Sequence, residues 1–252
     1  RKIDKGQMSL MFKKAEIVSF TRDLLETFEQ QTRVKKLDLK FHTSAPEIEM
    51  WIDPKNFDKI ILNLLSNACK FTPENGQVEI SLSTGEDTHL PQNAPLRRYV
   101  ELTVADSGIG IASTEREHIF ERFYQIRNSQ NNSNIGTGIG LHLTRSLVEL
   151  HYGNIHVEDN GEGRPGSRFI IRLPLGKEHL NIEEIDDNPV GNNTPVHITT
   201  ALPIPSSPVD EEDEKIRSKT KCHVLVVEDD EEIRKYICRE LASDFHMHEC
   251  AN

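Results

Sequence analysis

An acidic, proline-containing stretch at residues 176–220 divides the chain into parts that must fold separately. It carries two clusters of acidic residues and five prolines, namely Pro189, Pro195, Pro203, Pro205 and Pro208. Such a composition buries too little apolar surface to offset the conformational entropy of folding, so we expect an extended, mobile linker. We assign residues 16–175 to one domain and residues 221–252 to the beginning of another.

The first domain mixes helix and strand patterns without a regular βαβ alternation. Apolar residues at helical spacing predict helices over 16–36, 54–71, 114–125 and 138–152. Apolar alternation predicts strands at 37–44 and 48–53, which we expect to pair, at 77–84 and 99–106, and in a closing hairpin formed by NIHVEDN and SRFIIRLPL. This order predicts an α/β (α+β) two-layer sandwich in which helices cover one face of a mixed sheet.

Regular patterns return after the linker. The segment HVLVVEDDEEIRKYICREL combines a fully apolar run at 224–227, acidic residues, and apolar residues at helical spacing. It predicts a strand, a turn and a helix, which together open a parallel α/β unit. His246, His248 and Cys250 follow at alternate positions. They are read either as metal ligands or, more simply, as alternation along a short strand.

Charge and cysteine content exclude several classes of protein. With 41 acidic and 30 basic residues the formal charge is −11, so we expect no nucleic acid contact by this segment. The four cysteines form no CxxC pair, which indicates reduced thiols and a cytoplasmic setting. No apolar run approaches the ~18 residues of a membrane span. We expect that the segment does not cross a membrane by itself.

The helix predicted over 54–71 carries a polar face beside its apolar stripe. Asn63, Asn67 and Lys70 stand at positions i, i+4 and i+7, which places two carboxamides and one ammonium in a row. Amide oxygens suit a Mg²⁺ ion that keeps several waters, and a lysine offers a point charge to phosphate oxygens. The row therefore indicates a metal and phosphate site, or else an ordinary solvated helix face.

The segment DSGIGIA follows the apolar strand 99–105. Asp106 leads into a turn containing Gly108 and Gly110, where the backbone can approach a ligand while a carboxylate is fixed at the sheet edge. Such a carboxylate can accept a hydrogen bond from an exocyclic amine, which distinguishes adenine from guanine. The alternative is a glycine turn with a purely structural role.

A third constellation lies in SNIGTGIGLHLTRSLVEL. Gly136, Gly138 and Gly140 precede a predicted helix, whose free N–H groups and dipole favour a phosphate. The motif is neither a Walker A loop nor a dinucleotide-binding GxGxxG. The polar run QIRNSQNNSN before it predicts a mobile lid.

Taken in order, these segments resemble the sequence boxes of sensor histidine kinases. NLLSNACKFT resembles the N box, DSGIGI the first glycine box, IFERFY the F box, and GTGIGLHL the second glycine box. The match covers about residues 54–175. The resemblance implies the ATP-binding fold shared with gyrase and mismatch-repair ATPases, which has a mixed five-stranded sheet backed by helices.

The resemblance also implies ligands and residue roles, with ATP and Mg²⁺ as the ligands. It implies that Asn67 ligates Mg²⁺, while Asn63 and Lys70 contact metal-bound waters or phosphates. It further implies that Asp106 accepts from the adenine amine, that Phe71 contacts adenine, and that Ser167 reaches adenine through water. The other ATP-binding residues that it implies are Gly108, Gly110, Arg127, Gly136, Thr137, Gly138, Gly140 and Leu141.

Two positions bear on the reaction that the resemblance implies. Hydrolysing relatives have a glutamate where this chain has Asn63, and an amide cannot act as a general base, which favours a kinase over an ATPase. Gln125 stands where an arginine often follows the F box, which makes Arg127 the nearest cation for the γ-phosphate. The alternatives are a hydrolysing ATPase of the same fold and a non-catalytic nucleotide-binding interaction module.

The resemblance places both phosphoacceptors outside these residues. Residues 1–15 resemble the end of the dimerising helical hairpin and its connector, and we expect the acceptor histidine upstream. Residues 221–252 resemble the start of a receiver domain, in which Glu228 and Asp229 would bind Mg²⁺ as an incomplete site. The implied protein is a hybrid sensor kinase. Its partners are a phosphoacceptor hairpin of the same or a second subunit and a receiver domain, and its parent is a homodimer, in the cytoplasm or attached to the bacterial inner membrane.

Overall fold

The computed structural model describes residues 9–126, 137–161, 163–186, 223–227, 231–242 and 245–250. They belong to two compact units, one within Gly6–Val196 and one within His197–Asn252. No helix among these residues is long and apolar enough to span a bilayer. Residues 1–15 are expected to contain the end of the dimerising hairpin and its connector, and residues 1–8 of them lie outside the described residues. Residues 187–220 of the expected linker lie outside them as well.

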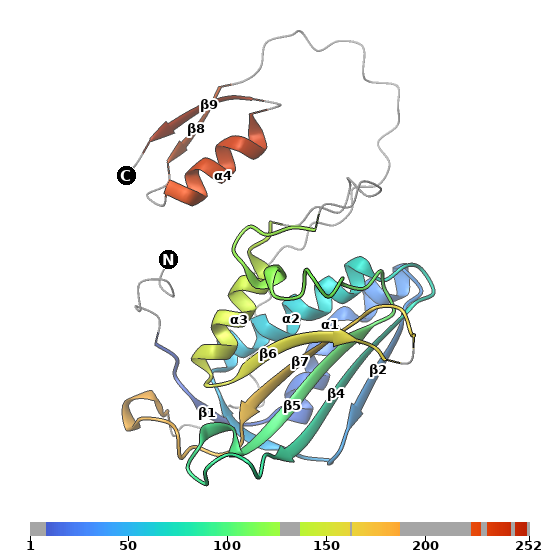
Figure 1. The fold of residues 1–252 in the computed structure, drawn as a ribbon, viewed down its shortest axis with the longest axis vertical. Helices are drawn as coiled ribbons and strands as arrows, with labels where there is room; N and C mark the ends of the chain where they lie inside the picture. The colour runs from blue at the N-terminus through green and yellow to red at the C-terminus, as the bar shows by residue number, and fades with distance from the viewer. Residues whose placement is uncertain are drawn as a thin grey trace. The chain divides into compact units, whose positions relative to one another are not determined.

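A mixed five-stranded sheet forms the centre of the first unit (Figure 1). Its strands, in spatial order, are β2 (Asp38–Thr43), β4 (Gln77–Glu86), β5 (Arg98–Asp106), β7 (Ser167–Pro174) and β6 (Asn154–Asp159). β2 runs parallel to β4, and every other neighbouring pair is antiparallel. The predicted sheet and its closing β6–β7 hairpin are therefore confirmed.

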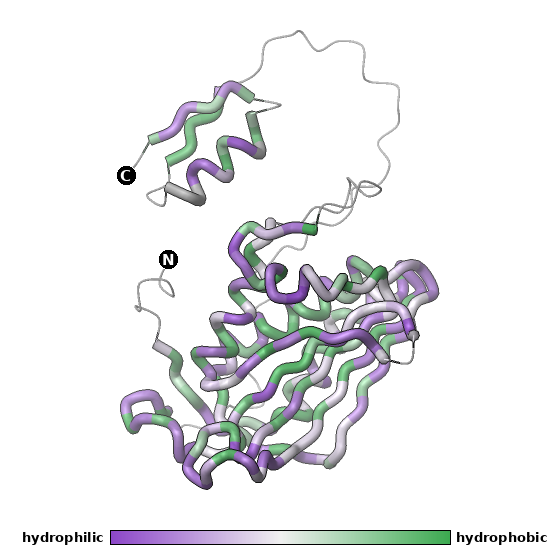
Figure 2. Tube along the Cα trace, viewed as in Figure 1, coloured by the Kyte–Doolittle hydropathy of each residue, from purple (hydrophilic) through white to green (hydrophobic). Residues whose placement is uncertain are grey.

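Three helices cover one face of this sheet, namely α1 (Ile17–Val34), α2 (Pro54–Phe71) and α3 (Gly140–Leu150) (Figure 1). Hydrophilic and apolar residues alternate along the central strands (Figure 2), so Val78, Ile80 and Leu82 of β4 are buried while their neighbours are not. The helices contribute fully buried residues such as Ile61 and Leu65. The two-layer sandwich that the sequence predicted follows from these two periodicities.

Helix α2 begins where the sequence placed its start. The Asp53 carboxylate accepts hydrogen bonds from the backbone N–H groups of Lys55 (3.1 Å) and Asn56 (3.3 Å), and Pro54 occupies the first turn. The second carboxylate oxygen accepts from the N–H of Met11 at 3.0 Å. One side chain thus caps the helix and fixes the N-terminal segment of the domain beside it.

The predicted pairing of 37–44 with 48–53 is wrong. β3 (Glu49–Ile52) pairs with β1 (Lys13–Glu16) in a separate two-stranded sheet, whereas β2 joins β4. The Glu16 carboxylate accepts from the N–H of Ile48 at 2.9 Å and from the first turn of α1, which holds the start of β3 beside β1. A contact between Glu16 and Ile48, which are 32 residues apart in the chain, therefore helps to select β1 as the partner of β3.

The helix predicted over 114–125 is also wrong. This segment consists of turns and one 3₁₀ turn, η2 (His118–Phe120). Phe120 is 4 % exposed and packs edge-to-face on Phe169 of β7, while Phe123 adopts a left-handed backbone conformation with φ 63°. A continuous helix cannot include that conformation, so the burial of Phe120 and the turn at Phe123 override the helical periodicity.

The domain continues past the boundary that composition suggested. Residues 176–186 form turns and the 3₁₀ turn η3 (Ile182–Glu184), and the Tyr152 hydroxyl donates to the Glu184 carboxylate at 2.9 Å. Ile185 also forms a β-bridge with Phe12. The extended linker predicted from residue 176 therefore begins after Asp186 at the earliest.

The second unit is a small βαβ arrangement. It contains β8 (His223–Val227), α4 (Glu231–Leu241) and β9 (His246–Cys250), and its two strands are parallel. The predicted strand and helix are confirmed. His246, His248 and Cys250 lie on β9, so their spacing is the alternation of a short strand that the sequence offered as the simpler interpretation.

Asp58 on α2 makes the stability of the first unit depend on pH. Burial raises the pKa of Asp58 to about 6, and its Oδ1 is buried without a hydrogen-bond partner in the described part of the chain. Because the folded-state pKa lies above the ordinary value of 3.8, stability should fall as the pH rises from about 4 through 6. Asp58→Asn should remove this fall and stabilise the unit by about 1–2 kcal/mol at pH 7, measured by urea unfolding across this pH range.

The exposed Asp38 on β2 provides the control. Asp38→Asn should change the free energy of unfolding by less than ~0.5 kcal/mol. A lower stability of Asp58→Asn at pH 7, or an unchanged pH profile, would contradict the assignment.

Candidate nucleotide-binding site

Close contacts bring together the three segments that the sequence singled out. A Cβ on Gly108, after β5, would lie 2.5 Å from the carbonyl oxygen of Phe71 at the end of α2. A Cβ on Gly140, at the start of α3, would lie 2.4 Å from Oδ1 of Asn63. The polar face of α2 therefore lies between the Asp106 turn and the N-terminus of α3, and all three elements contribute to one site.

The row of polar side chains on α2 is partly buried rather than freely solvated. The Asn63 amide donates to the Thr144 hydroxyl of α3 at 2.8 Å, which ties the two helices together. In the part of the chain that the structure describes, the half-buried Asn67 side chain makes no hydrogen bond. Burial lowers the pKa of the Lys70 ammonium, which lies 5.2 Å from the Phe71 ring centroid. The row thus keeps an amide and a cation available for a ligand.

Asp106 is the buried carboxylate of the site, and only 8 % of the residue is exposed. Burial raises its pKa, and the backbone N–H groups of Gly108 and Ser167 partly offset this rise by donating to the carboxylate. The Gly108 N–H lies 2.8 Å from Oδ1. Ser167 is itself buried, whereas 40 % of Phe71 is exposed. An oriented acceptor in apolar surroundings can recognise one donor on a ligand base.

The N-terminus of α3 begins in a constrained turn. Gly138 has φ +68°, and a Cβ there would lie 2.7 Å from the backbone of Phe123. Its carbonyl oxygen accepts from the N–H of Phe123 at 2.9 Å. No side chain caps α3 at Ile139, so the first N–H groups of the helix keep their capacity for an anion. Thr137 is exposed and Leu141 is half-buried.

Four of the predicted site residues lie outside the described residues, namely Arg127, Gly136, Glu228 and Asp229. No cluster of three His, Cys, Asp or Glu side chains within the described ranges has the geometry of a metal site. Gly110, with φ +73°, lies against the backbone of Gly166.

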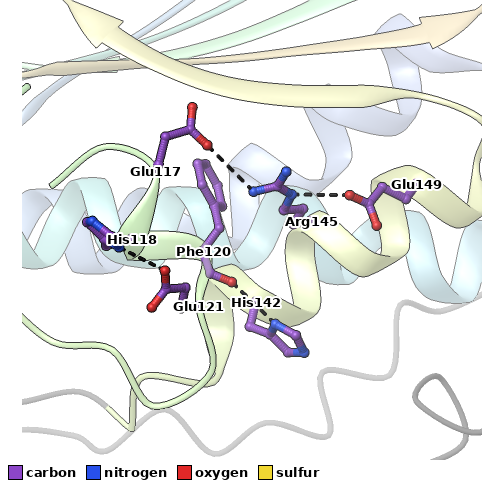
Figure 3. Close-up of polar contacts among 7 residues, drawn as sticks. All are labelled: Glu117, His118, Phe120, Glu121, His142, Arg145 and Glu149. Carbon is purple, nitrogen blue, oxygen red and sulfur yellow. Dashed lines mark hydrogen bonds and ion pairs between the residues drawn. The ribbon is translucent and has the colours of Figure 1, made fainter. Parts of the chain in front are cut away.

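A set of contacts that the sequence did not predict holds the η2 segment against α3 (Figure 3). The His142 ring donates from Nδ1 to the Phe120 carbonyl oxygen at 3.2 Å, and the Arg145 guanidinium lies 5.6 Å from the Phe120 ring centroid. Arg145 also forms an ion pair with Glu149 at 3.1 Å. With the Phe123–Gly138 hydrogen bond, these contacts fix the chain on both sides of residues 127–136.

Lys35 is a second residue that sequence reasoning missed. Its ammonium donates to the carbonyl oxygens of Cys69 (2.8 Å) and Lys70 (3.0 Å), in the last turn of α2. A cation there satisfies carbonyls that the helix leaves without partners and interacts favourably with the helix dipole. No local pattern around Lys35 reveals this contact, because its partners are 34 and 35 residues away.

Comparison with known proteins identifies the domain. Residues 52–177 match the family described as "Histidine kinase-, DNA gyrase B-, and HSP90-like ATPase". The chain belongs to this family. The sensor histidine kinase TmoS of Ectopseudomonas mendocina is 33 % identical over 98 % of this chain, which covers 24 % of that protein. Histidine kinase P4 of Formosa agariphila is 28 % identical over the whole chain, which covers 18 % of that protein.

A solved structure agrees with this assignment to a histidine kinase-like ATPase domain. The catalytic domain of histidine kinase ThkA is 25 % identical and superposes with a TM-score of 0.54, covering 66 % of this chain and 99 % of that domain. The predicted resemblance and fold are therefore confirmed for the ATP-binding domain. The chain itself spans about a quarter or less of the first curated relatives.

The close contact of Gly166 with Asp106 predicts that this histidine kinase-like domain does not tolerate a side chain at position 166. A Cβ on Gly166, whose φ is +101°, would lie 1.7 Å from the Asp106 carbonyl oxygen, so the backbone must move. Gly166→Ala should cost roughly 2–5 kcal/mol of unfolding free energy, measured by urea denaturation.

Gly163→Ala separates the clash from the backbone conformation. Gly163 has a similar left-handed conformation, with φ +70°, but a Cβ there would meet nothing within 4 Å. Its substitution should cost only about 1 kcal/mol. Equal costs at the two glycines would show that the contact with Asp106 is unimportant.

Proposed function

We propose that this chain is the ATP-binding, phosphoryl-donating part of a hybrid two-component sensor histidine kinase. The observation that carries the proposal is the convergence of Asp106, the polar face of α2 and the N-terminus of α3. The Asp106 carboxylate accepts a hydrogen bond from the adenine amine, Phe71 contacts the adenine ring, and Ser167 reaches the adenine through a water molecule. The triphosphate then extends toward the first N–H groups of α3.

The residues present fit a magnesium ion bound with the nucleotide. Asn67 offers a half-buried amide without a protein hydrogen-bond partner in the described part of the chain. Amide oxygens are hard oxygen ligands, which suit Mg²⁺, and the ion would neutralise charge on the phosphates. Asn67 would hold the ion, while Asn63 and Lys70 contact its waters or the phosphates.

The remaining proposed contacts complete the binding of the phosphates. In this proposal Gly136, Gly138, Gly140 and Leu141 supply backbone N–H groups together with Thr137, and Arg127 is the candidate cation for the γ-phosphate. Gly108 and Gly110 let the backbone approach the base. These residues orient the nucleotide and offset its charge, which is most of what phosphoryl transfer requires from a protein.

The chemistry of Asn63 favours transfer to a protein acceptor over hydrolysis. Its amide nitrogen is committed to Thr144, and an amide has no basic atom that could take a proton from water. The site therefore binds and orients ATP without activating a water molecule. We propose that the acceptor is a histidine on an upstream helical hairpin, of the same subunit or of its partner in a homodimer.

The small βαβ unit supports a second proposal about the parent protein. A strand, a helix and a parallel strand, in β8, α4 and β9, form the opening of a doubly wound fold, as a receiver domain requires. We propose that Glu228 and Asp229, between β8 and α4, belong to its Mg²⁺ site. The phosphoryl group would then be relayed from the acceptor histidine to an aspartate of this receiver.

Asp106→Asn tests recognition of the base. The variant should lower ATP affinity roughly tenfold or more and reduce the preference for ATP over GTP, measured by calorimetric titration. Its melting temperature should stay close to that of the unmodified chain, because the substitution also removes a buried charge. Unchanged preference in a folded variant would refute the base contact, and Asp38→Asn provides the control.

Asn67→Ala tests the metal contact. The increase in ATP affinity that Mg²⁺ produces should shrink by roughly tenfold or more, while binding without Mg²⁺ stays the same. Titrations with and without a chelator measure this difference. Asn154→Ala, which changes an exposed amide on β6, is the matched control. An undiminished Mg²⁺ effect would refute the assignment. Steady release of phosphate by the unmodified chain would favour the hydrolysing ATPase instead.

A further inference from the structure

Asn160, which follows β6, donates to two main-chain carbonyl groups. Its Nδ2 lies 2.6 Å from the carbonyl oxygen of Asp106 and 2.7 Å from that of Pro165. Asp106 is 54 residues away in the chain, at the end of β5, and Pro165 lies in the turn before β7. One side chain therefore bridges the residue that we assign to base recognition and the turn beside it.

The two partners determine which end of the Asn160 side chain faces them. Both are carbonyl oxygens, so the NH₂ group must point toward them and its two hydrogens are both used. A carboxylate of the same size has no hydrogen to donate, and a hydroxyl has one. The position thus requires a carboxamide for reasons of hydrogen-bond chemistry rather than of volume.

The bridge acts on the Asp106 carboxylate through the turn that precedes β7. The backbone N–H of Ser167, two residues after Pro165, lies near enough to that carboxylate to lower its pKa. Gly166 lies between them with its α-carbon packed against the Asp106 carbonyl group, and Nδ2 of Asn160 lies 2.9 Å from the place where a Cβ on Gly166 would be. Asn160 therefore holds residues 165–167 where Ser167 can orient the carboxylate.

We propose that Asn160 is a positioning residue that sets the purine selectivity of the site. This inference rests on the proposed function, because it assumes that Asp106 recognises the base. An acceptor in the right place pairs with the exocyclic amine of adenine and opposes the carbonyl oxygen of guanine. A displaced carboxylate pairs less well with ATP and opposes GTP less strongly, so the ratio of the two affinities falls.

The test compares MgATP with MgGTP by calorimetric titration of the whole chain. The set comprises the unmodified chain, Asn160→Ala, the milder Asn160→Ser, which keeps one donor, Asp106→Asn, and the double variant Asp106→Asn/Asn160→Ala. Asn154→Ala is the matched control, and circular dichroism with thermal melting reports the fold. Asn160→Ala should lower the ATP:GTP affinity ratio about three- to tenfold, with Asn160→Ser between it and the unmodified chain.

The double variant distinguishes action through Asp106 from a general loosening of the turn. If Asn160 acts through Asp106, Asn160→Ala should change the ratio little once Asp106 is already asparagine. A lower melting temperature with an unchanged ratio in both Asn160 variants would overturn the inference and leave Asn160 a structural residue. If the unmodified chain bound ATP and GTP equally, the proposed role of Asp106 in base recognition would be refuted too. This result differs from the one that refutes only the role of Asn160, so the two failures can be told apart.

Discussion

The buried carboxylate of Asp106 at the end of β5 is the constraint on which the rest of the site depends. A charge in apolar surroundings must be matched by hydrogen-bond donors, and here two backbone N–H groups serve that role. One donor, Gly108, follows β5, and the other, Ser167, begins the neighbouring strand β7, so both segments must approach the carboxylate closely. The approach leaves no room for a side chain on Gly166, and it places the end of α2 against Gly108. The burial of one carboxylate is thus linked to the packing of three segments, which are the turn after β5, the turn before β7 and the end of α2.

Helix α2 connects that arrangement to the N-terminal part of α3. Asp53 fixes its beginning, and the ammonium of Lys35 satisfies carbonyl groups in its last turn. Its buried face, with Ile61 and Leu65, packs into the core. Its polar face is tied to α3 through Asn63 and Thr144. The position of the polar row formed by Asn63, Asn67 and Lys70 is therefore set by the same contacts that hold the sandwich together.

The sequence predicted what depends on local pattern. Helix α2 followed from an apolar stripe and an Asp-Pro start, and the sheet strands followed from alternation. The partner of β3 was missed because the Glu16 carboxylate, far away in the chain, decides it. The segment 114–125 was missed because a left-handed Phe123 and a buried Phe120 interrupt a helix that the spacing favours.

The candidate site likewise contains features that local sequence patterns predict and features that depend on distant contacts. The glycine turns and the polar row were visible in the sequence because each occupies a few consecutive turns of chain. The side chains that position them, such as Lys35, Thr144 and Asn160, act on partners 34 to 81 residues away. Nothing in their own neighbourhoods distinguishes them from surface residues.

This separation has a physical consequence for how the domain tolerates change. Side chains of α2 that face the core of the domain contribute to stability through burial, whereas those on its polar face are only partly buried. The thiol of Cys69 lies on the buried side, and burial raises its pKa to about 11, which keeps it protonated and a poor nucleophile. The last turns of α2 therefore present amides, an ammonium and an aromatic ring to the candidate site. In the function that we propose, these groups place the nucleotide for phosphoryl transfer to the acceptor.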